Sequence, residues 1–169
     1  MDIEYTNSKV EWTYNGESVE FHIEGIEFAY TTKDYVRLEV YHNGGFEYYY
    51  LLFSGKEICK YDRNGELVIF TASGEQEIKH NSIIGVTILE NRIYVITDDN
   101  TIFTYDFEAN HIGEIQAPAG YVYERFIDVT GLGVVCIADP TYADQYGRVD
   151  YKFEYDFDKN EWEKKSLAY

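Results

Sequence analysis

Apolar and polar residues alternate along most of the chain from Val10 onward. An alternation with a period of two is typical of strands, and turn-favouring residues recur about every ten positions, as in an all-β chain. No stretch carries apolar residues at helical spacing, and the polar stretch 73–82 is expected to hold at most one helical turn. The sequence therefore predicts strands joined by tight turns, at Asn15-Gly16, Gly44-Gly45, Ser54-Gly55, Asn64-Gly65 and Asp98-Asp99-Asn100.

Part of this strand pattern repeats. Residues 48–62 align without a gap with residues 92–106, and both copies end in a Tyr-Asp pair. A third pair, Tyr155-Asp156, ends a copy with a longer inner loop. Such repetition is typical of proteins built from one supersecondary unit. Each copy is predicted to be a four-stranded antiparallel meander, with an N-terminal hairpin unit before them; the ranges are 1–31 for the hairpin unit and about 34–71, 82–117 and 121–168 for the meanders.

The middle strands carry apolar side chains on both faces, as in "RIYVIT" and "TIFTY". Neighbours along a strand point to opposite sides of a sheet, so both faces of these sheets are expected to be covered. Stacked sheets cover one another in this way in β-propellers. The sequence predicts a single all-β domain, a propeller-like array of three to four such meanders, with a β-trefoil or a β-sandwich as the alternative. The N-terminal strands would supply a fourth unit, or a homodimer would close an open arc.

Residues 149–167, "VDYKFEYDFDKNEWEKKSL", resemble the third and fourth strands of a kelch repeat, in which Tyr155, Asp156, Asn160 and Trp162 occupy the characteristic places. Residues 91–115 are similar to a quinoprotein-type propeller blade. The resemblance covers about residues 34–168 in three copies and implies propeller blades. The sequence departs from the kelch pattern in two ways: the Gly-Gly pair is missing from the second strand, and Trp occurs in one full copy.

The Tyr-Asp pairs are interpreted as structural. The Tyr is expected to pack between sheets, and the Asp is expected to start a turn by accepting hydrogen bonds from backbone amides two residues on. A repeated active site is the less favoured interpretation. The segment that breaks the repeat, the long loop of the third copy, is therefore the favoured location of a functional site.

Charge narrows the choice of partners. The chain has 31 acidic and 14 basic residues, a net charge of −17. Such a surface repels phosphate backbones, which argues against direct nucleic-acid binding, and it attracts basic proteins. Cys59 and Cys136 are expected to be reduced and buried. The N-terminus lacks the features of a signal peptide and no apolar run reaches membrane-spanning length, so a cytoplasmic location without membrane contact is expected.

Motifs for catalysis are missing from the sequence. The four histidines do not fall at zinc-ligand spacing with Cys or with one another; they are His22, His42, His80 and His111. The acidic turns lack the features of a calcium loop. Neither a nucleophile elbow nor a phosphate-binding or dinucleotide-binding glycine loop occurs. The chain is therefore predicted to be no enzyme and to hold no cofactor or metal.

Many of the 18 tyrosines must share the surface with the carboxylates, since a domain of this length has a limited interior. Aromatic anchors within negative charge suit a binder of basic proteins. In size, acidity and lack of catalytic motifs, the chain resembles bacterial immunity proteins, which neutralise polymorphic or contact-dependent toxins. The resemblance implies an inhibitor that occludes the active site of a basic nuclease toxin; the alternative is a carbohydrate- or ligand-binding β-repeat module. The candidate partner-binding residues are Asp139, Tyr142, Asp144, Tyr146, Asp98, Asp99 and Glu108.

Overall fold

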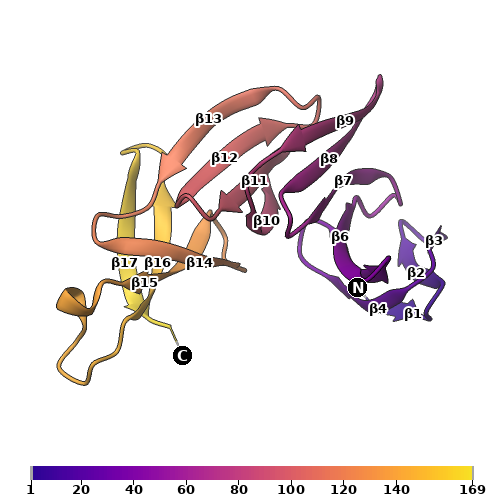
Figure 1. Ribbon diagram of the computed structural model, residues 1–169. Coiled ribbons are helices and arrows are strands. Elements are labelled where there is room, and N and C mark those ends of the chain that lie inside the picture. Colours follow the sequence, from indigo (N-terminus) through magenta and orange to yellow (C-terminus); the bar gives the residue numbers. More distant parts are fainter. Residues whose placement is uncertain (1, 169) are drawn as a thin grey trace. The chain divides into compact units, whose positions relative to one another are not determined.

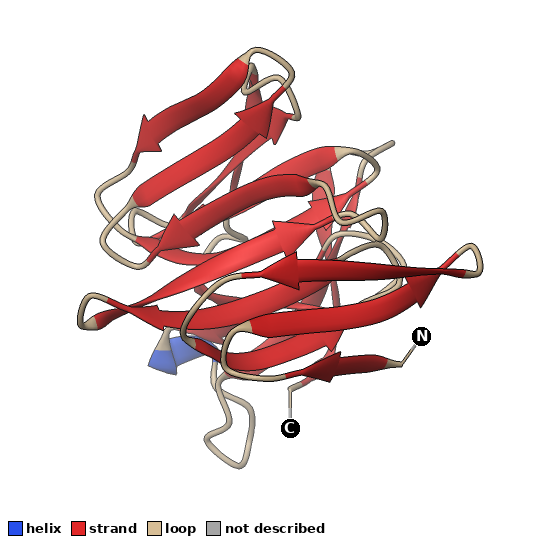
Figure 2. Cartoon of the chain, turned by 90° about the vertical axis from the view of Figure 1, so that its right-hand side faces the viewer, coloured by secondary structure: helices blue, strands red, loops and turns tan. Residues whose placement is uncertain are grey.

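The computed structural model describes residues 2–168. Strands make up 63% of the described residues and helix 2%, so the predicted all-β class is confirmed (Figures 1 and 2). Within the described residues the helical segment is one 3-10 turn, η1 (Pro140–Tyr142). The strands are β1 (Ile3–Tyr5), β2 (Lys9–Tyr14), β3 (Glu17–His22), β4 (Ile26–Thr31), β5 (Val36–His42), β6 (Gly45–Leu51), β7 (Glu57–Asp62), β8 (Glu66–Thr71), β9 (Gly74–Lys79), β10 (Ile83–Leu89), β11 (Arg92–Thr97), β12 (Thr101–Asp106), β13 (His111–Gln116), β14 (Tyr121–Ile127), β15 (Gly133–Ala138), β16 (Asp150–Asp156) and β17 (Glu161–Leu167).

Strands that follow one another in sequence are hydrogen-bonded neighbours in each of the four antiparallel sheets formed by residues 2–168. Two sheets are the predicted four-stranded meanders, β10–β13 and β14–β17. The other two have three strands, β1–β3, and six strands, β4–β9. These consecutive meanders are compatible with a propeller-like β-repeat fold.

The six-stranded sheet is longer than predicted at both edges. No strand was predicted at 73–82, where the sequence was expected to hold at most one helical turn, but Gly74–Lys79 forms β9, which pairs with β8. β9 is an edge strand with mostly exposed side chains, so it has no apolar face to produce an alternating pattern. At the other edge, β4 pairs with β5, whereas β1–β3 form a sheet of their own.

The chain divides into two compact units: Met1–Ile83 with Asp106–Asn110, and Ile84–Tyr105 with His111–Tyr169. In the first unit, the three-stranded sheet packs against one face of the six-stranded sheet through a shared apolar core. In the second unit, β10–β13 pack against β14–β17 through another apolar core. Each of these cores covers one face of the sheets that it joins, and Ile93 and Val95, on the other face of β11, are fully buried as well, as expected for a sheet covered on both sides. The buried residues of the two cores include Val10, Trp12, Val36, Leu38 and Val40 in the first unit and Tyr94, Ile96, Ile102, Val134 and Cys136 in the second.

Each unit contains one tryptophan that connects its two sheets. The indole N–H of Trp12, on β2, donates to the backbone carbonyl of Phe53, after β6, at 2.7 Å. The indole N–H of Trp162, on β17, donates to the carbonyl of Gln116, at the end of β13, at 2.9 Å. Both indoles are thereby used inside the fold.

The structural interpretation of the Tyr-Asp pairs is confirmed for two turns. A side-chain oxygen of Asp106 accepts from the amides of Glu108 and Asn110, both at 2.9 Å. Asp156 accepts from the amide of Asp158 at 3.0 Å. Asp62 differs, because its carboxylate accepts from the amide four residues on, that of Glu66, at 3.0 Å.

The two cysteines are free and buried, as expected. Burial raises the pKa of both thiols, that of Cys136 to about 12. A thiol with a raised pKa is a poor nucleophile, so both side chains act as core residues.

Candidate functional site

Four of the seven candidate residues lie in the β15–β16 loop, residues 139–149, which lengthens the third meander. The loop begins at Asp139, whose carboxylate accepts from the amide of Thr141 at 2.9 Å and from its hydroxyl at 2.7 Å. These bonds cap the short η1 turn. They also lower the pKa of Asp139, so this side chain stays anionic at neutral pH.

The second half of the loop is organised by Asp144. Its carboxylate accepts from the amides of Tyr146 and Arg148 at 2.8 and 2.9 Å, and from Arg148 Nε at 2.7 Å. The pattern matches the Asp106 turn, where amides two and four residues on are also bound. The hydrogen bond and charge of Arg148 lower the pKa of Asp144. Asp144 therefore holds the loop in shape, a use that the sequence prediction did not include.

Asp139 and Asp144 form hydrogen bonds within the loop, whereas its two tyrosines are exposed and available to a partner. Tyr142 is 54% exposed and Tyr146 is 73% exposed. The ring of Tyr142 packs against that of Tyr121, with centroids 6.0 Å apart, and the guanidinium of Arg148 lies 5.0 Å from the centroid of Tyr146. Each ring therefore has one supported side and a large exposed area, as expected of an aromatic anchor.

A hollow of about 320 Å³ adjoins the start of this loop. Gly120 also packs closely against the loop, because a Cβ there would come within 2.6 Å of the Tyr142 ring. The walls of the hollow are largely apolar and Asp139 supplies a carboxylate; the lining residues are Gly120, Tyr121, Val122, Ile137, Ala138 and Asp139. Such a hollow next to exposed aromatic rings can accept a side chain from a binding partner.

Two further candidates, Asp98 and Asp99, lie in the turn between β11 and β12 and are exposed. The carboxylate of Asp99 accepts from the Thr97 hydroxyl at 2.5 Å. The next residue, Asn100, donates to the carbonyl of Tyr121 at 3.0 Å and accepts from the amide of Tyr123 at 2.8 Å. The turn thus contacts the start of β14, on which the ring of Tyr142 also packs. The structure places these two carboxylates at the same end of the second unit as the loop.

Glu108 is the candidate that the structure separates from the others. It lies in the turn after β12, at the opposite end of this strand from Asp98 and Asp99. Its amide donates to Asp106, and its side chain is exposed. We therefore leave Glu108 out of the candidate site and define the "β15–β16 site" as the loop, the adjacent hollow and the Asp98–Asp99 turn.

Sequence reasoning missed the support beneath the loop. The ring of Tyr121 contacts that of Tyr142, and the Tyr121 hydroxyl accepts a hydrogen bond from Lys164 Nζ at 2.8 Å. The Lys164 ammonium also lies 3.3 Å from the ring centroid of Tyr151, an arrangement that stabilises a cation in place of an ion pair. The tyrosines of β14 and β16 follow the alternation typical of strands. This pattern does not distinguish a residue that packs beneath a loop from one that packs in the core.

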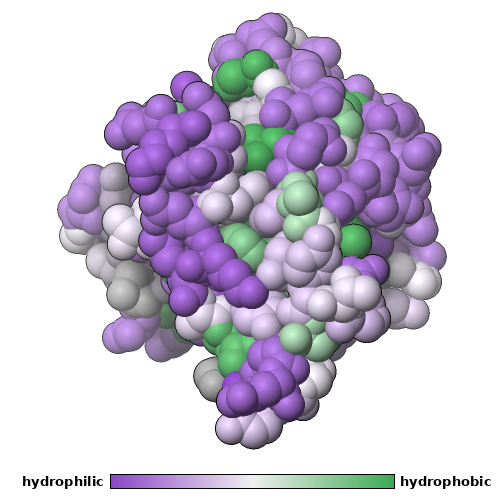
Figure 3. Space-filling model, turned by 90° about the vertical axis from the view of Figure 1, so that its left-hand side faces the viewer, coloured by the Kyte–Doolittle hydropathy of each residue, from purple (hydrophilic) through white to green (hydrophobic). Residues whose placement is uncertain are grey.

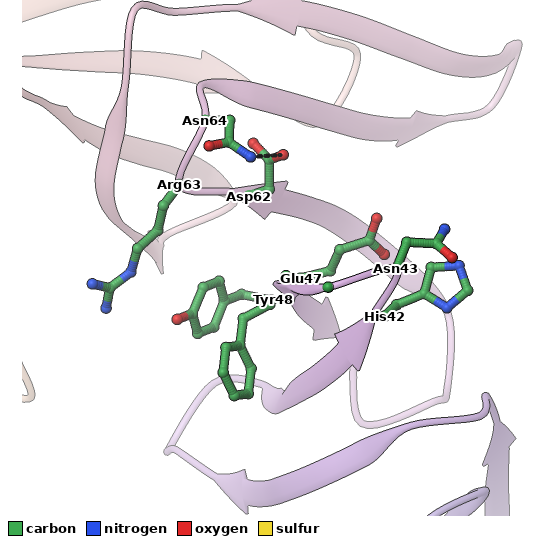
Figure 4. Close-up of a pocket in the computed structure, with 10 residues that line it drawn as sticks. His42, Asn43, Glu47, Tyr48, Asp62, Arg63 and Asn64 are labelled. Carbon is green, nitrogen blue, oxygen red and sulfur yellow. Dashed lines mark hydrogen bonds between the residues drawn. The ribbon is translucent and has the colours of Figure 1, made fainter.

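A second pocket, of about 680 Å³, lies in the first unit between two turns (Figure 4). One side is the β5–β6 hairpin, and the other is the turn that follows β7. Figure 4 shows Asp62 and Asn64 on that turn, with His42, Asn43 and Glu47 on the side of the hairpin. The lining comprises residues 42–45 with Phe46, Glu47, Tyr48, Asp62, Arg63 and Asn64.

On the face drawn in Figure 3, hydrophilic side chains predominate and apolar ones form small separate patches. Within residues 2–168, no group of three or more His, Cys, Asp or Glu side chains is arranged to hold a metal ion. No helix in this part of the chain has the length and apolar character needed to cross a membrane.

Comparison of the sequence with protein-family models and with curated proteins finds no match.

Proposed function

We propose that the chain is an acidic protein inhibitor of the immunity type, which binds a basic nuclease toxin through the β15–β16 site and occludes its active site. The observation that carries the proposal is the pair of exposed tyrosines, Tyr142 and Tyr146, on a loop held in one shape by Asp139 and Asp144. A pre-shaped loop loses little conformational entropy on binding, so more of its contact energy becomes affinity.

Charge supports the same function. A net charge of −17 attracts a protein whose cleft is positively charged in order to hold phosphates. Two cationic groups at the site, the Lys164 ammonium and the Arg148 guanidinium, are already engaged by Tyr121 and Asp144. The hollow combines apolar walls with the Asp139 carboxylate, which suits the long side chain of a lysine or arginine.

The fold supports it as well. The resemblance of the repeats to kelch and quinoprotein-type blades suggests a rigid set of sheets whose connecting loops can vary without disturbing them. The β15–β16 loop is such a variation, because the equivalent connection between β11 and β12 is a short turn. We place the binding function in this added segment.

The test uses the protein encoded by the neighbouring gene, with isothermal titration for the affinity and stopped-flow mixing for the association rate. Immunity complexes are tight, so we expect a dissociation constant of about 1 nM or lower, and an association rate that falls at least about tenfold between 50 and 500 mM salt. Inhibition of the nuclease at one-to-one stoichiometry would accompany binding. Micromolar binding that does not respond to salt would contradict the proposal.

The site itself is tested with the double variant Tyr142→Ala/Tyr146→Ala, which leaves the organising aspartates in place. Loss of two aromatic anchors should weaken the complex about 100-fold or more. The matched control is Tyr5→Ala/Tyr14→Ala, which removes two exposed rings from the first unit. If both double variants bind with the affinity of the wild type, the β15–β16 loop is not the contact surface.

A further inference from the structure

The pocket of the first unit arises from an unequal pairing of strands. The β5–β6 pairing extends to His42 opposite Gly45, at the tip of the hairpin. The β6–β7 pairing begins only at Glu47 opposite Asp62. Gly45 and Phe46 therefore extend beyond the end of β7, and the pocket lies in the corner between this overhang and the turn at Asp62–Asn64. Backbone groups of the overhang have no strand partner on that side.

The aromatic wall of this corner is continuous. Phe46 is 44% exposed and Tyr41 is 49% exposed, with ring centroids 5.2 Å apart. Behind them, Phe46 is stacked with Tyr48 at 6.5 Å, and Tyr48 is stacked with the buried Tyr61 at 4.8 Å. The rings of this row support one another, so the exposed faces at its end are pre-positioned for a ligand to stack on.

The polar groups of the corner lie on both faces of the sheet, Asp62 on the face of Glu47 and the Arg63 guanidinium on the face of Tyr48. Asp62 and Asn64 lie on the turn, linked by a hydrogen bond of 3.2 Å (Figure 4). The guanidinium of Arg63 lies 5.8 Å from the centroid of Tyr48 and forms no ion pair within residues 2–168. Planar guanidinium and amide groups provide donors in fixed directions, whereas the carboxylates and Asn64 provide acceptors.

Two ligand classes fit this corner poorly. An anion would face Glu47 and Asp62 within a protein of net charge −17. A cation would find both carboxylates already engaged, since Glu47 accepts from the Tyr49 hydroxyl at 2.7 Å and Asp62 accepts from Asn64 and Glu66. Arg63, moreover, already lies beside the ring of Tyr48. A neutral ligand with many hydroxyl groups avoids both costs, because each hydroxyl both donates and accepts.

We propose that this corner, the "β6–β7 pocket", binds a neutral saccharide, with the apolar C–H face of a sugar ring stacked on Phe46 and its hydroxyls bonded to the guanidinium of Arg63, which lies on the same face of the sheet, beside Tyr48. The volume of about 680 Å³ lies within the usual range for small-molecule sites. The pocket belongs to the first unit and the inference does not rest on the inhibitor function.

The test uses the full chain on an array of neutral, sialylated and sulphated glycans, followed by calorimetric titration with the neutral glycan that binds best. We expect binding to neutral glycans only. Phe46→Ala should weaken it at least tenfold, and Arg63→Gln should weaken it severalfold. Because Phe46 and Arg63 are exposed, neither change should impair folding, which circular dichroism will verify. Phe28→Ala, which removes another exposed phenylalanine of the same sheet, is the control and should leave the affinity unchanged.

Three results would overturn the inference. The first is an array without any bound neutral glycan. The second is preferential binding of charged glycans, and the third is an affinity that Phe46→Ala and Phe28→Ala reduce equally. Toxin binding is measured in parallel with the same variants. The saccharide site and the inhibitor function are thereby tested independently, and failure of one does not decide the other.

Discussion

Trp12 in the first unit and Trp162 in the second make the same connection in different surroundings. Each indole N–H donates to a backbone carbonyl of the neighbouring sheet. Trp12 is only 2% exposed and belongs to the apolar core, whereas Trp162 lies at the edge of its core, partly exposed, beside Tyr123 and Tyr155. The hydrogen bond is shared, so a difference in stability between the two positions should come from burial.

The strands that carry the two tryptophans are also anchored by different turns. Trp12 lies on β2, which ends at the turn Asn15-Gly16, where both residues have positive φ, 53° and 83°. Trp162 lies on β17, which begins after the turn organised by Asp156. The first turn depends on backbone conformation and the second on a charged side chain. The two units should therefore respond differently to a backbone substitution and to pH.

The largest effect is expected from Trp12→Ala. Removing a buried indole leaves a cavity between the sheets and an unpaired carbonyl at Phe53, which should lower the free energy of unfolding by about 3–5 kcal/mol. The measurement is urea denaturation followed by circular dichroism. Trp12→Phe is the companion variant and should cost less, since it keeps most of the apolar contacts. Equal losses for both variants would show that the hydrogen bond outweighs the packing.

Trp162→Ala is expected to cost less, about 2 kcal/mol, because part of the indole is already in contact with water. The same denaturation experiment measures it. If Trp162→Ala lowers the free energy of unfolding as much as Trp12→Ala does, burial does not explain the difference between the two positions. In that case the aromatic contacts of Trp162 with Tyr123 and Tyr155 would be stronger than its exposure suggests.

Most of the fold was predictable because the repeat leaves a visible pattern. Residues 92–116 form β11–β13 as the alternation indicates, and the Tyr-Asp pairs mark turns. The pattern failed at β9, an edge strand with exposed side chains, for which the sequence has no apolar face to reveal. The turn residues at 71–74 were the one sequence feature that could have indicated this hairpin. The Thr71 hydroxyl donates to the backbone carbonyl of Gly74 and closes the β8–β9 hairpin.

The candidate site was less predictable. The long β15–β16 loop stood out as an interruption of the repeat, and Tyr142 and Tyr146 are exposed on it. The role of Asp144 could have been inferred, since Asp106 has the same spacing to its bonded amides. The contact of Asn100 with β14 joins residues far apart in the sequence, and local pattern carries no information about it. The β6–β7 pocket depends on the offset between two strand pairings, which is set by the register and is likewise invisible in the pattern.

Gly16→Ala tests the turn of the first unit. Gly16 has a φ of 83°, which an L-residue adopts at a cost of about 1–2 kcal/mol, although a Cβ there would meet no neighbouring atom. The loss of stability should therefore be independent of pH between 5 and 8. Gly113→Ala is the control, because this glycine lies in β13 without a positive φ and with equal space around it. A larger loss at Gly113 than at Gly16 would contradict the assignment of the cost to φ.

The smallest effect is expected from Asp156→Asn, which keeps the turn and removes its charge. Hydrogen bonds from Lys159 and Asp158, together with the charge of Lys159, lower the pKa of Asp156 in the folded protein. A carboxyl whose pKa is lowered on folding stabilises the protein above its unfolded value, near 3.9, and loses that contribution as the pH falls through the folded value. The melting temperature of the variant should lie a few degrees below that of the wild type at pH 6, and the two curves should converge as the pH falls through the folded value. Asp128→Asn, at an exposed aspartate after β14, is the control and should run parallel to the wild type. A gap that persists undiminished at pH 2 would mean that Asp156 acts through the shape of the turn, as the Asn15-Gly16 turn does, and the contrast between the two units would disappear.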